Sequence, residues 1–148
     1  MDRYDLQRFV SAQDAGGSYD AARRELAAGR KESHWMWFIF PQIAGLGRSA
    51  TAKRYAISSL DEAREYLRHP VLGPRLMAVS DSLRTLQPSS AEQIFGAVDA
   101  QKLRSSMTLF GRAAPDSRVF QDVLDQYYGG APDPATDREL ARPERGTG

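Results

Sequence analysis

Residues 33–42 read Ser-His-Trp-Met-Trp-Phe-Ile-Phe-Pro-Gln, and this stretch decides the fold. It holds both tryptophans of the chain and two of its six phenylalanines. Burial of so much apolar and aromatic surface is the largest local driving force in the sequence. Polar residues flank the apolar run, with Lys31, Ser33 and His34 before it and Gln42 after it. The stretch is therefore predicted to be a central core element, the floor of a pocket, or both.

Hydrophobic periodicity does not settle the secondary structure of this stretch, because nearly every position is apolar. Trp, Phe and Ile also occur readily in strands. However, no other segment offers a strand partner, and a lone strand would leave its backbone groups unpaired. We therefore predict a short buried helix of two turns, capped by Ser33 and ended by Pro41.

Hydrophobic spacing and cap residues predict further helices on both sides of the stretch. Their expected ranges are 4–15, 19–28, 50–56, 61–68, 73–86, a short helix ending at Gly96, 98–113, 118–128 and about 133–141. Capping boxes are predicted at Ser59–Glu62 and Ser90–Gln93. Short connections between so many helices indicate an all-α fold, a single compact globular domain of about seven to nine helices. The domain is expected to span 1–141, followed by a flexible C-terminal tail at 142–148.

Composition excludes several classes of protein. Twenty basic and nineteen acidic residues give a net charge of +1, which argues against a nucleic-acid partner. The absence of cysteine excludes disulfides, a thiol nucleophile and a cysteine zinc site. The start has no signal-peptide pattern, and no apolar run could span a bilayer, so we expect a soluble, cytoplasmic protein without membrane contact. Nucleotide-loop and metalloprotease motifs are absent, so no cofactor and no metal are expected. The oligomeric state is left open.

Several longer motifs carry a resemblance to a known family. They are Lys31-x-Ser-His-Trp-Met-Trp-Phe-Ile-Phe-Pro-Gln42, Gly45-Leu-Gly-x-Ser49, Tyr55-Ala-Ile57, His69-Pro-x-Leu-Gly73, Ile94-Phe-Gly96 and Lys102-Leu-x-Ser-Ser-Met-Thr-Leu-Phe110. Over about residues 4–140 the chain resembles a bacterial family of unknown function, which automated annotation sometimes labels calpastatin. The resemblance implies a compact all-α fold and no established activity. The calpastatin label conflicts with the composition, because such inhibitors are largely disordered and this chain can build its own core.

The polar margins of the aromatic stretch supply the first candidate site residues. His34 is either a histidine bonded to backbone at the edge of the core or a general base, since its ordinary pKa allows proton exchange at neutral pH. Trp35 and Trp37 would point about 200° apart on a helix, so both cannot line one small pocket. One is expected in the core, and the other could offer its ring or indole N–H to a ligand.

The helix predicted at 98–113 supplies the second group. Asp99 and Lys102 are three residues apart, which is typical of a surface ion pair. Alternatively, Lys102, Ser105 and Ser106, together with Arg104, could bind a phosphate or carboxylate. The loop at 45–49 is either an ordinary turn or an anion cradle of backbone N–H groups, with Arg48 adding charge.

Our leading hypothesis is a pocket between the aromatic stretch and the 98–113 helix. It would bind a small anionic ligand, with nucleotide-like molecules among the candidates. Lys31, Gln42 and the serines would contact that ligand. If the protein is an enzyme, a cofactor-independent hydrolase or transferase is expected, with His34 as base and Lys102 stabilising charge. The rival hypothesis is a non-catalytic protein-interaction module, whose aromatic stretch is purely core and whose exposed apolar patch lies near Tyr127 and Tyr128.

Overall fold

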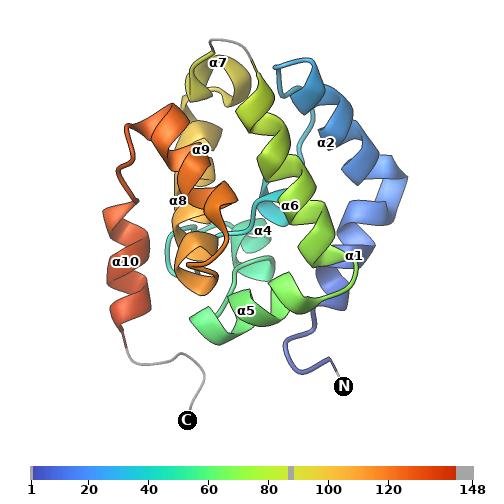
Figure 1. The fold of residues 1–148 in the computed structure, drawn as a ribbon. Helices are drawn as coiled ribbons and strands as arrows, with labels where there is room; N and C mark the ends of the chain where they lie inside the picture. Colours follow the sequence, from blue (N-terminus) through green and yellow to red (C-terminus); the bar gives the residue numbers. More distant parts are fainter. Residues whose placement is uncertain (1, 87–88, 143–148) are drawn as a thin grey trace.

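A computed structural model describes residues 2–86 and 89–142, in which α-helices are the main secondary structure (Figure 1). The α-helices are α1 Gln7–Asp14, α2 Ser18–Ala27, α3 Met36–Ile39, α4 Ala50–Arg54, α5 Leu60–Arg68, α6 Leu72–Ser82, α7 Ala91–Phe95, α8 Ala97–Ala113, α9 Arg118–Tyr128 and α10 Pro134–Ala141, with 3₁₀ turns at Ala15–Gly17 and Leu83–Thr85. In the described ranges the only β-type pairing is an isolated parallel bridge between Ile43 and Ile57. The predicted all-α single domain is confirmed. Most of the predicted tail, 143–148, and residues 87–88, which lie between two of the predicted helices, are outside the described residues.

Local cap chemistry sets several helix ends. The predicted capping box at α7 is complete, because the Ser90 hydroxyl accepts from Gln93 N and the Gln93 side chain accepts from Ser90 N. At α5 only half of the predicted box forms. Ser59 accepts from Glu62 N, but the Glu62 carboxylate accepts instead from the backbone N–H and hydroxyl of Ser58. The Glu62 side chain is buried. While one carboxylate oxygen accepts from Ser58, the other forms an ion pair with Arg8.

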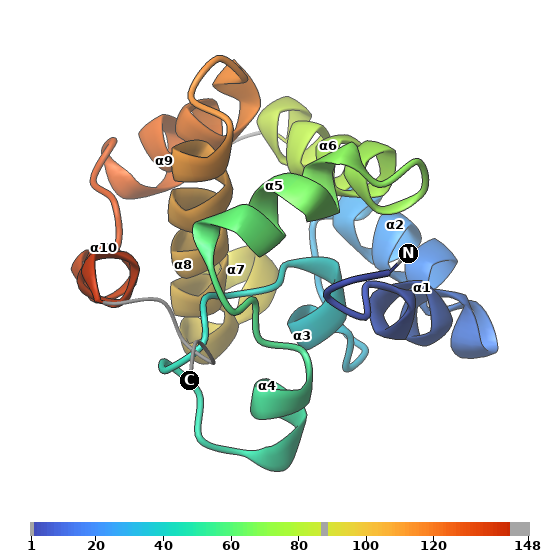
Figure 2. The ribbon, with the colours of Figure 1, turned by 90° about the horizontal axis from the view of Figure 1, so that it is seen from below.

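Helix α8 is the axis of the fold. It packs against α5, α7, α9 and α10, and α6 bridges α5, α9 and α2 (Figures 1 and 2). The face of α8 toward the core carries Leu103, Met107 and Phe110, none of which is accessible to solvent. The buried apolar residues of the described helices form one continuous core. Because α8 lies at its centre, its remaining solvent-facing stripe is held in a fixed position.

The aromatic stretch forms less helix than predicted. Helix α3 is a single turn that begins after Trp35 and ends before Phe40, and the N-cap position has no side-chain hydrogen bond. The predicted Ser33 cap is wrong, because the Ser33 hydroxyl donates to the carboxylate of Glu25 on α2, at 2.6 Å. The N-cap position of α3 is Trp35, two residues beyond Ser33, so Ser33 is not placed to cap the helix and is held against α2 instead.

Residues 42–57, which we call the strap, leave the core and return to it. Ile57 N donates to Gln42 O, and Ala44 N donates to Ile57 O, both at 2.8 Å, so the strap closes on itself. The Arg8 guanidinium donates to the carbonyls of Arg54 and Ala56 and fixes its returning end. Helix α4 stands apart from the helical body (Figure 2), and none of its five residues is buried. The strap is thus anchored at its two ends, with its middle facing solvent.

Candidate functional site

The carboxylate of Glu25 orients the chain that leads into the aromatic stretch. It accepts hydrogen bonds from Glu32 N, Ser33 N, the Ser33 hydroxyl and the indole Nε1 of Trp35, at 2.6–2.9 Å. Burial by itself would raise the pKa of Glu25, but the bonds from Ser33, Glu32 and Trp35 outweigh it and lower that pKa to about 2. Trp35 is 1% exposed, so this carboxylate satisfies an indole N–H that has no access to water.

Two lysines meet at one carboxylate beside the tryptophans. Lys31 Nζ lies 2.9 Å from Asp99 Oδ2, and Lys102 Nζ lies 3.5 Å from Asp99 Oδ1. Each ammonium also stands over an indole ring, Lys31 over Trp35 and Lys102 over Trp37, at 5.1 and 5.0 Å from the ring centroids. The cluster therefore carries two positive charges and one negative charge, and Lys31 holds the closer contact.

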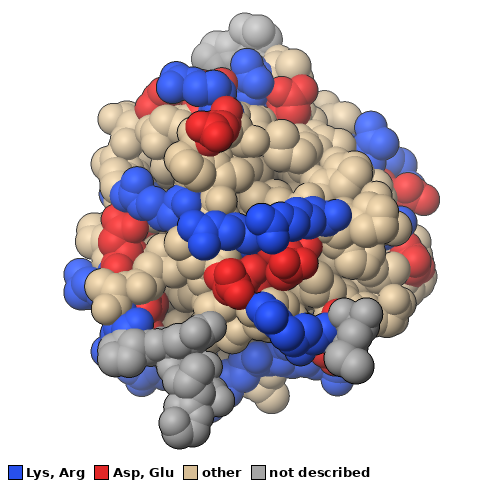
Figure 3. All heavy atoms as spheres, turned by 60° about the horizontal axis from the view of Figure 1, so that its bottom comes forward, with Lys and Arg blue, Asp and Glu red and all other residues tan. Residues whose placement is uncertain are grey.

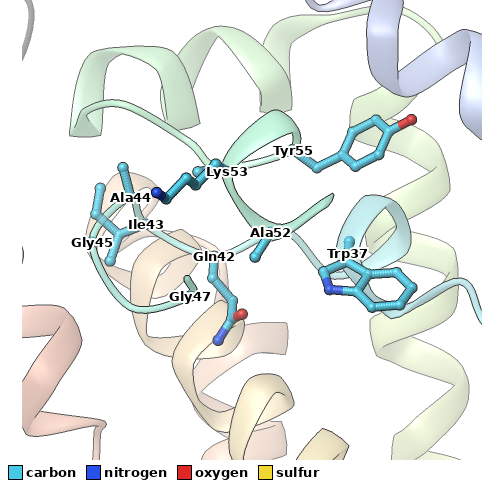
Figure 4. Close-up of a pocket in the computed structure, with 10 residues that line it drawn as sticks. Trp37, Gln42, Ile43, Ala44, Gly45, Gly47, Ala52, Lys53 and Tyr55 are labelled. Atoms are coloured by element: carbon cyan, nitrogen blue, oxygen red, sulfur yellow. The ribbon is translucent and has the colours of Figure 1, made fainter. Parts of the chain in front are cut away.

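Trp37 borders a hollow of about 300 Å³ between α3 and the strap, whose lining residues are shown in Figure 4. Gln42, Gly45 and Gly47 form one wall, and Lys53 and Tyr55 form another. The Gln42 side chain extends from the strap toward α8, and the indole nitrogen of Trp37 lies on the side of its ring that faces Gln42 (Figure 4). This hollow has the size of a small ligand site.

A second hollow, of about 440 Å³, lies between the strap and α8. Its lining residues are Gln42, Leu46, Gly47, Val98, Gln101, Lys102, Ser105, Asp133 and Ala135. Gln42 and Gly47 line both hollows, so the two spaces adjoin. We call the pair the strap cleft.

The hollow beside Trp37 contains polar groups with unused hydrogen-bonding capacity. Across residues 2–86 and 89–142, the Trp37 indole N–H, the Gln42 side-chain amide and the Lys53 ammonium have no hydrogen-bond or ion-pair partner. By contrast, the single O–H donor of Ser105 is already engaged, because Asp133 Oδ2 and Gln101 O lie 2.7 and 3.1 Å from its oxygen.

Asp133 is a buried acceptor at the edge of the second hollow. Its carboxylate accepts from the hydroxyls of Ser105 and Thr136, both at 2.7 Å, and from Ala135 N. Burial by itself would raise the pKa of Asp133, but the bonds from Thr136 and Ser105 outweigh it and hold that pKa below its usual range. The group is therefore negatively charged at neutral pH.

Four of the predicted site residues lie at the strap cleft, namely Trp37, Gln42, Lys102 and Ser105. Lys31 joins them indirectly, through Asp99. The predicted separation of the tryptophans is also found, with Trp35 in the core and Trp37 at the cleft.

The other predicted site residues lie elsewhere. His34 is exposed, lines neither hollow, and makes no hydrogen bond or ion pair within the described part of the chain. Arg48 is likewise exposed and unpaired among the described residues. Ser106 is fully buried, and its hydroxyl has no hydrogen-bond partner there. The geometry therefore does not join His34 to Lys102.

Sequence reasoning missed Lys53, Val98 and Glu25. One signal could have found Lys53: the chain has only three lysines, Lys31, Lys53 and Lys102, among its twenty basic residues. All three lie at or next to the strap cleft. Val98 and Glu25 gave no such signal, because their surroundings are made by distant segments.

Charges on the face shown in Figure 3 are mixed, with Lys and Arg side chains lying directly beside Asp and Glu side chains. Such a surface lacks the one-sign field that a polyanion partner requires. Among the described residues, no group of three or more His, Asp or Glu side chains could hold a metal ion. In the same residues, no helix combines the length and apolar character needed to cross a bilayer.

A family model described as a protein of unknown function, DUF1810, matches residues 3–140. The chain belongs to this family. The crystal structure of the conserved hypothetical protein Rv1873 from Mycobacterium tuberculosis is similar to it, with a TM-score of 0.91 and 50% sequence identity. The match covers 95% of this chain and 99% of that one. No curated protein matches the chain. These relatives establish the family and its fold but bring no activity with them.

Proposed function

We propose that this protein binds a small molecule bearing an oxyanion, a carboxylate or a phosphate, in the strap cleft. One observation carries the proposal: three donors without a partner in the described chain line a single hollow of about 300 Å³. They are the indole N–H of Trp37, the amide of Gln42 and the ammonium of Lys53. An oxyanion is an acceptor for each of these kinds of donor, and hydrogen bonds between charged groups are about twice as strong as neutral ones.

The charge balance beside the hollow supports the same ligand class. Lys31 and Lys102 share Asp99, so the cluster has one positive charge in excess. Lys31 makes the shorter contact and also donates to Ser33 O at 2.6 Å, which leaves Lys102 as the cation that can turn toward a ligand. A partly buried cation without a full counter-charge is stabilised by an incoming anion.

The proposal is for binding and includes no reaction. His34, the predicted base of a hydrolase or transferase, lines neither hollow. The rival interaction-module hypothesis expects an apolar patch near Tyr127 and Tyr128. Both rings pack against the core, and their hydroxyls donate to Leu83 O and Ala100 O. That region therefore offers no support for the rival.

Nuclear magnetic resonance of the two indole N–H groups tests the proposal directly. Titration with sodium acetate or inorganic phosphate should move the Trp37 indole resonance and leave that of Trp35 in place, because Trp35 already donates to Glu25. Sodium chloride at the same ionic strength is the control for screening.

Variants assign the effect to the hollow. Gln42→Ala and Lys53→Gln should each weaken acetate binding several-fold, while Gln7→Ala on α1 leaves it unchanged. If acetate and phosphate move the Trp37 resonance no more than chloride does, the proposal is wrong.

A further inference from the structure

The second hollow of the strap cleft is built on a stripe of α8. Val98, Gln101, Lys102 and Ser105 stand at spacings of three and four residues, so they share one face of the helix. This is the face of α8 that the strap overlies, and Leu46 of the strap lines the hollow opposite it.

The exposed end of this stripe is apolar. Val98 is 71% exposed, whereas nearly every other large apolar side chain in the described ranges is buried or packed against the core. Leu46 and Ala135 are half-buried and line the same hollow. The strap, α8 and α10 therefore each present an apolar side chain to one space that no described side chain fills. Covering such surface is favourable in proportion to its area.

A glycine lies where the two hollows adjoin. Gly47 lines both, and a Cβ atom added there would collide with the methyl group of Ala52 on α4. Any side chain at position 47 would therefore require Ala52, and with it α4, to shift. Because Gln42 and Gly47 line both hollows, the unpartnered donors on one side of Gln42 and the apolar walls on its other side belong to one cleft.

We infer that the ligand is an amphipathic monocarboxylate, with its carboxylate at Gln42 between Lys53 and Lys102 and its hydrocarbon part over Leu46, Val98 and Ala135. The inference rests on the proposed function and adds the shape and polarity of the ligand. A ligand with a second anionic group is disfavoured in the hollow beside α8, because the negatively charged carboxylate of Asp133 lines it.

The test is a chain-length series followed by the Trp37 indole resonance: acetate, butanoate, hexanoate and octanoate, with adenosine monophosphate as a competing class. A fully buried CH₂ contributes about 0.8 kcal/mol, equal to about four-fold in affinity. For a half-open hollow we expect about two-fold tighter binding per added CH₂.

A matched pair of variants locates the hydrocarbon part. Val98→Asn should abolish most of the gain with chain length and leave acetate binding unchanged. Met77→Asn, at another exposed apolar residue, on α6, should keep the full gain. Both positions are at the surface, so the fold tolerates the change.

The possible failures are distinct. If acetate moves the Trp37 resonance but longer carboxylates bind no more tightly, the inference is overturned and the proposed function stands. Tighter binding of adenosine monophosphate than of octanoate also overturns it, in favour of a nucleotide-like ligand. If no anion in the series acts beyond the chloride control, both proposals fail.

Discussion

Glu25→Gln tests how the chain positions its aromatic stretch. The substitution keeps the shape of the side chain but removes its charge. In the native protein, four donors from Glu32, Ser33 and Trp35 converge on this carboxylate. A neutral amide oxygen accepts these bonds more weakly, and its NH₂ group cannot accept from any of them. We expect the variant to fold and to be less stable.

The size of the loss follows from the pKa of Glu25, which falls from 4.5 to about 2 on folding. Since a tenfold change in acid dissociation corresponds to about 1.4 kcal/mol, this fall sets a ceiling of about 3 kcal/mol. The carboxylate is only half-buried, and water screens part of the interaction. We therefore expect Glu25→Gln to lower the free energy of unfolding by about 1–2 kcal/mol at pH 7.

The pH dependence distinguishes this charge effect from a packing effect. A carboxyl group whose pKa is lowered on folding stabilises the protein above its unfolded pKa, here 4.5, and this contribution fades as the pH falls toward about 2. Urea unfolding followed by tryptophan fluorescence should therefore show a difference between native protein and variant that shrinks by about half or more from pH 7 to pH 3.

A neighbouring glutamate provides the control for net charge. Glu32→Gln makes the same change in charge at an exposed side chain, and it should leave the free energy of unfolding within about 0.5 kcal/mol of the native value. If the loss caused by Glu25→Gln is equal at pH 7 and pH 3, or matches that of Glu32→Gln, the carboxylate does not act as described.

Three further substitutions probe the fold, each read by thermal or urea unfolding. Arg8→Ala should cost about 3–5 kcal/mol, because it leaves the buried Glu62 carboxylate without its cation; equal stability of variant and native protein would refute this. Gly73→Ala should destabilise by about 2 kcal/mol or more, since a Cβ there would overlap the Leu67 carbonyl oxygen. Gly111→Ala, where the nearest side-chain atom is 3.7 Å from the added Cβ, should instead stabilise α8 by about 0.5–1 kcal/mol. The same sign for both glycine variants would contradict this account.

Helices that carry their own signals could be predicted from the sequence. The bounds predicted for α9 from its apolar stripe and the glycine that follows it are the observed ones, Arg118–Tyr128. The Ser90–Gln93 box forms as predicted, because its cap bonds join residues only three positions apart. Such features depend on spacing along the chain, which the sequence states directly.

The aromatic stretch was only partly predictable. The angle between the two tryptophans on a helix predicted that one would lie in the core and the other would be free. Tertiary contacts decided which of the two is buried. Glu25 lies ten residues before Trp35, and its carboxylate selects this indole for the core while drawing Ser33 away from the helix start. No local pattern in the sequence links Glu25 to Ser33 and Trp35. The predicted helix was therefore longer than the single turn that forms.

The sequence by itself determined an all-α domain, its helices and the polar groups at the margins of residues 33–42. Only the tertiary structure decided which of those groups share a space. It left His34 exposed to solvent and engaged the Ser105 hydroxyl with Asp133. It placed Gln42 in one hollow with Trp37 and Lys53 and in the adjoining hollow with Val98. The physical reason is that a site is made where distant segments pack together. Burial, pairing and free hydrogen-bonding capacity depend on that packing, and spacing along the chain does not reveal it.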